Sequence, residues 1–68
     1  MSEYNEFQQR VVNELKELVI KVVALGSFIA SNKIFPTLPK EEQDRLMRQH
    51  AAMLEYLAVL EERITAFS

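Results

Sequence analysis

The sequence predicts an all-α protein: one antiparallel two-helix hairpin that assembles into an oligomeric helical bundle. Three observations predict it. Apolar residues recur in alternating steps of three and four residues along two segments, which is the spacing of a helical seam. Both prolines of the chain fall in the short segment between these two stretches. The chain has 68 residues, so we expect residues 1–68 to form a single domain.

The first helix is expected over about residues 4–33. Its seam is apolar throughout and consists of Val11, Leu15, Leu18, Val22, Leu25 and Ile29. The only glycine of the chain, Gly26, lies inside this helix, where glycine costs about 1 kcal/mol relative to alanine. Two interpretations stay open for it: a tolerated weak point, or a place where another helix backbone approaches closely.

The turn is expected over about residues 34–38, and the second helix over about 39–66. A residue that precedes proline avoids the α region, so Phe35 and Leu38 should be extended. Pro39 suits the first position of a helix. The second seam consists of Leu46, His50, Met53, Leu57, Leu60, Ile64 and Phe67.

A short connection forces the two helices to run antiparallel, so that the two seams pair layer by layer. Leu18 then lies opposite Leu57, and Leu25 lies opposite His50. We interpret His50 as a half-buried residue that fixes the register of the seam. The alternative is a pH-sensitive or ligand-facing imidazole.

A second apolar face remains beside the seam, and it is too large for a small protein to leave in water. A core of this size rarely supplies more than about 3–5 kcal/mol, and the chain has no cysteine with which to form disulfides. We therefore expect a homo-oligomer, a dimer or larger. The residues expected at its interface are Val12, Val19, Val23, Met47 and Leu54.

Composition excludes several classes of function. The net charge of −2 gives no electrostatic footprint for duplex nucleic acid, and no stretch approaches the roughly 20 apolar residues of a membrane span. A single histidine without cysteine builds no zinc site. No nucleophile–base pair or phosphate-binding loop is present, so we expect neither a metal, nor a cofactor, nor enzymatic activity. The expected location is the cytoplasm.

One set of side chains has the chemistry of a nucleotide site. Aromatic rings stack on bases, and arginine or lysine neutralises phosphates. The candidate ligand-binding residues are Tyr4, Phe7, Arg10, Lys16 and Arg63. The alternative is a solvated face, in which Arg63 pairs with Glu14, Arg10 with Glu6 or Glu14, and Lys16 with Glu17 or Asn13.

Two motifs resemble small phage proteins first noted in crAss-like phages. The first is Phe7-x-x-Arg10-Val11-x-x-Glu14, followed by Glu17-Leu18-x-x-Lys21. The second is Gln49-x-x-x-Met53-x-x-Tyr56-x-x-x-Leu60-x-x-Arg63-Ile64. This group is similar to the helical-hairpin family of phage anti-defence sponges, which counter cyclic-oligonucleotide-based antiphage signalling (CBASS) or Thoeris.

The resemblance implies a helical hairpin that forms higher oligomers, often hexamers, and holds a cyclic dinucleotide or trinucleotide between protomers without cleaving it. In that family an N-terminal aromatic residue stacks on a base and a lysine of the first helix meets phosphate; Tyr4 or Phe7 and Lys16 are the nearest equivalents here. Two alternatives remain. One is an oligomeric interaction protein that binds a host or phage protein and no nucleotide; the other is an inhibitor that docks one helix into a groove of an enzyme.

Overall fold

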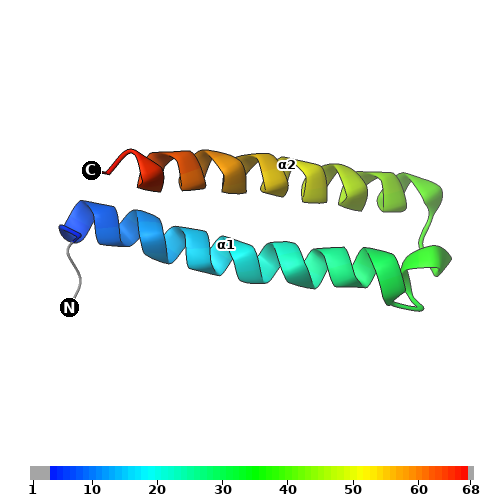
Figure 1. Ribbon diagram of the computed structural model, residues 1–68. Helices are drawn as coiled ribbons and strands as arrows, with labels where there is room; N and C mark the ends of the chain where they lie inside the picture. Colours follow the sequence, from blue (N-terminus) through cyan, green and yellow to red (C-terminus); the bar gives the residue numbers. More distant parts are fainter. Residues whose placement is uncertain (1–3, 68) are drawn as a thin grey trace.

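The computed structural model describes residues 4–67, and over these residues the protein is a rod of two long helices lying side by side (Figure 1). Helix α1 spans Glu6–Ser31, the short 3₁₀ helix η1 spans Phe35–Thr37, and helix α2 spans Lys40–Thr65. The rod measures 47 × 19 × 14 Å. The start of α1 and the end of α2 lie together at one end, and the turn lies at the other. The predicted all-α hairpin is confirmed.

Helix α1 begins where it does because Asn5 and Gln8 form a capping box. The Asn5 side chain accepts a hydrogen bond from the backbone N–H of Gln8 at 2.8 Å, and the Gln8 side chain accepts one from the backbone N–H of Asn5 at 3.2 Å. These bonds satisfy two N–H groups that a helix start otherwise leaves without partners. Glu6 adds a negative charge in the first turn, where the helix dipole favours it.

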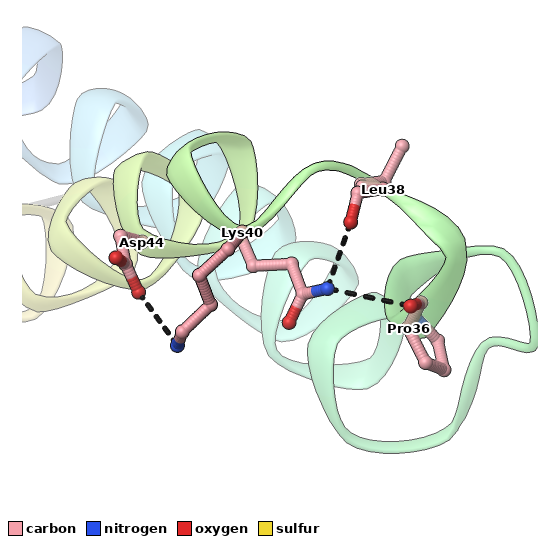
Figure 2. A network of polar contacts seen from close by, with 5 residues as sticks. Pro36, Leu38, Lys40 and Asp44 are labelled. Carbon is pink, nitrogen blue, oxygen red and sulfur yellow. Dashed lines mark hydrogen bonds and ion pairs between the residues drawn. The ribbon is translucent and has the colours of Figure 1, made fainter.

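The turn is tied together by polar contacts on both sides. Gln43 of α2 donates from Nε2 to the carbonyl oxygen of Leu38 at 2.9 Å and to that of Pro36 at 3.3 Å. Figure 2 shows these two carbonyls beside the ion pair between Lys40 and Asp44, whose Nζ and Oδ1 atoms lie 3.0 Å apart. On the α1 side, the Asn32 side chain accepts a hydrogen bond from the backbone N–H of Ile34.

Two local predictions for the turn were wrong. Phe35 is not extended but begins η1, where its ring packs edge-on against Phe28 with centroids 6.0 Å apart. Pro36 follows it inside the 3₁₀ turn, where a missing N–H costs nothing. Pro39 is the N-cap of α2 rather than its first helical residue, and its carbonyl accepts from Glu42 and Gln43. Leu38 is extended, as predicted.

The core is a narrow seam between the two helices. Among residues 4–67 four are buried: Val11, Leu18 and Val22 from α1, and Leu60 from α2. Leu60 is the only one of the described residues with a fully buried side chain, and it lies near the open end of the hairpin. Five partly buried residues pack against these four: Leu15, Met53, Leu57, Ile64 and Phe67. All of them belong to the two predicted seams.

Gly26 marks a close approach, although the approaching group is a side chain rather than a backbone. A β-carbon placed on Gly26 would lie 3.0 Å from Nε2 of His50. His50 is half-buried in the seam and reaches across from α2 into the space that the glycine leaves open. The contact fixes which levels of the two helices face each other.

We expect Leu60→Ala to lower the free energy of unfolding by about 2–5 kcal/mol, because it removes a fully buried side chain and leaves a cavity. Urea unfolding at one fixed protein concentration measures the loss. The matched control is the neighbouring Val59→Ala on the exposed side of α2, which should change it by only about 0.5 kcal/mol. Equal losses in the two variants would contradict the position of the core.

A double-mutant cycle tests the contact between Gly26 and His50. In a His50→Ala background, Gly26→Ala should stabilise the protein by about 1 kcal/mol, the difference in helix propensity. With His50 in place the gain should be smaller or absent, because the new β-carbon crowds the imidazole. Unfolding free energies of the four proteins give the coupling. The same gain in both backgrounds would show that the two residues do not touch.

Candidate functional site

The hairpin presents two unlike flanks to solvent, one on each side of the seam. The apolar flank is defined by Val12, Val19, Val23, Gly26 and Ala30 of α1 with Met47, Ala51, Leu54 and Ala58 of α2. The aromatic–basic flank is defined by Phe7, Glu14, Lys21 and Phe28 of α1 with Gln49, Tyr56 and Arg63 of α2. Heptad spacing on two antiparallel helices keeps each set on its own side.

The apolar flank is largely exposed in the single chain. Val23 is 65% exposed and Leu54 is 45% exposed, and Val19 and Met47 are also exposed, whereas Val12 is half-buried. Three further exposed apolar residues have no place in the predicted seams or flanks: Ile20 on the outer side of α1, Ile34 before η1, and Val59 on α2. The run of apolar residues in the middle of α1 was the signal for Ile20.

The open end of the hairpin gathers aromatic and basic side chains from both helices. The Arg63 guanidinium carbon lies 5.9 Å from the centroid of the Phe7 ring, a cation–π contact between α2 and α1. The rings of Tyr4 and Phe67 lie edge to face with centroids 5.8 Å apart. The open end therefore holds two contacts, one between the helices and one between the residues that flank them, and their side chains can stack on a base.

Ion pairs divide the candidate cations into two groups. Arg10 pairs with Glu6, with 2.9 Å between Nη2 and Oε1, so one of the solvated-face pairings is present. Both side chains are highly exposed, and such a pair contributes little to stability. Neither Arg63 nor Lys16 has an acidic partner within residues 4–67, where the other ion pairs are Lys40–Asp44 and Arg45–Glu42.

Two predicted pairings are therefore absent from the described part of the chain. Arg63 lies over Phe7 and not beside Glu14. Lys16 bonds neither Glu17 nor Asn13, and Asn13 instead accepts from the amide of Gln9 at 3.0 Å. Both cations are exposed.

The structure brings some of the five candidate residues together and separates one. Phe7 and Arg63 touch, Arg10 follows Phe7 by one turn of α1, and Tyr4 lies at the same end of the hairpin. Lys16 lies one turn beyond Val12 and one turn before Val19 and Ile20, and so borders the apolar flank. A ligand on Phe7 and Arg63 of one chain is therefore on the opposite side from Lys16 of that chain.

Within residues 4–67 no enclosed pocket is present, and no group of three or more acidic residues, histidines or cysteines is placed to hold a metal ion. No helix in the same range is both long and apolar enough to span a membrane. The candidate sites on the described part of the chain are therefore the two exposed flanks and the open end of the hairpin, and not a cavity.

Comparison with known proteins places these features in a family. A family model described as Sequestin matches residues 5–66. A curated relative from Enterobacteria phage T4, named as an uncharacterized 7.5 kDa protein in the denB-rIIB intergenic region, is 39% identical over 61 residues, which cover 90% of this chain and 94% of the relative. No solved structure gives a significant match. The resemblance to a small phage protein is confirmed, and the link to crAss-like phages stays a prediction.

Proposed function

The chain belongs to the Sequestin family, and from this premise we propose that it is a phage anti-defence sponge that binds a small phosphate-bearing nucleotide signal and holds it without cleaving it. The family name suggests sequestration of a ligand or partner. The ligand we propose is a cyclic dinucleotide or trinucleotide, bound by a homo-oligomer in the cytoplasm of the infected cell.

The observation that carries this proposal is Arg63, an exposed guanidinium held over the Phe7 ring with no acidic partner among the described residues. A guanidinium without a carboxylate partner is ready to bind phosphate oxygens through two parallel N–H donors. The exposed face of an aromatic ring beside it provides a surface on which a base can stack. Phosphate and base recognition thus meet at one contact between the two helices.

The arrangement favours binding over chemistry. The hairpin fixes Arg63 relative to Phe7 before any ligand arrives, which lowers the ordering cost of binding. Arg10 lies one turn from Phe7, and its exposed pair with Glu6 exchanges easily for a phosphate, because a surface pair of this kind is worth at most about 1 kcal/mol. Sequestration needs only that binding lowers the concentration of free signal below the threshold of its effector.

We expect a cyclic dinucleotide or trinucleotide to raise the melting temperature of the protein. Ligand at about 100 times its dissociation constant adds roughly 2.7 kcal/mol to the free energy of unfolding. Arg63→Ala should weaken binding by about ten-fold or more, the loss expected for a charge-assisted phosphate contact. Arg48→Ala is the matched control, since Arg48 is exposed on the outer side of α2 and has no acidic partner in the described range.

The ligand panel separates the candidates. It contains cyclic dinucleotides, cyclic trinucleotides and ADP-ribose derivatives, which all carry phosphates and a base but differ in how these are linked. A melting temperature that rises with ADP-ribose derivatives alone would support sequestration but identify a different signal as the ligand. No shift with any of them at high concentration would overturn the nucleotide site and favour the oligomeric interaction protein.

Recovery of the ligand tests sequestration against cleavage. We expect nucleotide incubated with excess protein and released by heat denaturation to return unchanged, because the sequence carries no recognised nucleophile–base motif that would activate water. Chromatography of the released nucleotide is the measurement, with a nucleotide incubated without protein as the reference. A time-dependent new product would show that the protein is an enzyme.

A further inference from the structure

The apolar flank carries one cation and one anion near the open end of the hairpin. Lys16 borders the flank from α1, and Glu61 borders it from α2, at the level of the same turns of the two helices. Both side chains are exposed, and neither has an ion-pair partner within residues 4–67. The flank is therefore an exposed apolar surface with opposite charges along its two long edges.

A second copy of the chain can cover this flank with its two-fold axis in one of two directions. If the axis runs along the helices, α1 of one subunit packs on the partner's α2, and residues at the same level face each other. Val23 then meets the partner's Leu54, and both side chains are exposed in the single chain. Lys16 meets the partner's Glu61, and symmetry makes this ion pair twice.

If the axis runs across the helices, α1 packs on the partner's α1 and the two hairpins point in opposite directions. If this axis also crosses α1 at the level of Val23, Lys16 lies toward the partner's Ala30 and Lys33, and Glu61 lies toward the partner's Met47 and Asp44. Each charge of the flank thus faces apolar surface or a like charge. Such an arrangement is less favourable than the one with the axis along the helices, in which each charge of the flank faces an opposite charge.

We propose that the apolar flank binds a second copy of the chain with the two-fold axis parallel to the helices, so that Lys16 of each subunit pairs with the partner's Glu61. This inference rests on the self-association that the proposed function requires. It assigns Lys16 to the subunit interface and leaves the aromatic–basic flank free for a ligand. It also brings both open ends, each with its Arg63–Phe7 contact, to the same end of a four-helix bundle.

Charge exchange tests the direction of the axis. We expect Lys16→Glu and Glu61→Lys each to raise the dimer dissociation constant about ten-fold, because each turns two ion pairs at the rim of the interface into repulsions. The double variant restores the two ion pairs with exchanged signs, so its dissociation constant should return to within about three-fold of the original. The remaining difference is expected because each exchanged charge has different neighbours. Sedimentation equilibrium over a dilution series measures the constants.

Arg48→Glu is the matched control, because it makes the same change of net charge on the outer side of α2 and should leave the dimer intact. Circular dichroism of every variant verifies that the helices are formed. A double variant as weak as the single ones, or a Lys16→Glu dimer tighter than the original, would overturn the proposed axis. So would a folded original protein that stays monomeric at high concentration.

The melting experiments on the same proteins keep the two proposals apart. If the double variant restores the dimer but no nucleotide raises the melting temperature, the proposed interface is supported and the proposed sequestration is contradicted. A nucleotide that raises the melting temperature of a protein whose double variant is not restored would retain the sponge and reject this interface.

Discussion

The structure depends on a geometric limit: each of two helices can bury only one stripe against the other. Four residues are buried in the seam, and only Leu60 among the described side chains is buried completely. The chain nevertheless contains far more apolar surface than one seam can cover, and Ile20 and Val23 stay more than half exposed. A single hairpin therefore buries the residues of its seam and leaves its apolar flank exposed to water. That remainder is an apolar surface larger than a small protein usually leaves in water.

The same limit separates the possible roles of the two flanks. The seam occupies the space between the helices, so no side chain reaches from one flank to the other. Lys16 borders the apolar flank, while Arg63 and Phe7 meet on the other side at the open end. An exposed apolar surface and an aromatic–basic surface thus coexist on opposite sides of a rod 19 Å wide.

The long-range architecture followed from spacing, whereas the turn did not. Alternating apolar steps predicted both helices and their antiparallel pairing, since burial of a stripe dominates the energetics of a helix in a protein. Phe35 escaped the prediction because the preference of a residue before proline is weak beside a ring contact with Phe28. Gly26 was left between two interpretations, because spacing alone does not show which group fills the space beside it.

The sequence by itself determined the hairpin, its register, the exposed apolar flank and the residue types available for a nucleotide. These features depend on the periodicity of apolar residues along the chain, and that periodicity can be read directly from the sequence. Only the tertiary structure decided the partners of the charged side chains. Arg10 pairs with Glu6 within its own helix, whereas Arg63 lies over the Phe7 ring of the facing helix and not beside Glu14, the partner that spacing predicted. That choice turns on distances between helices, which differ too little between candidates for spacing to resolve.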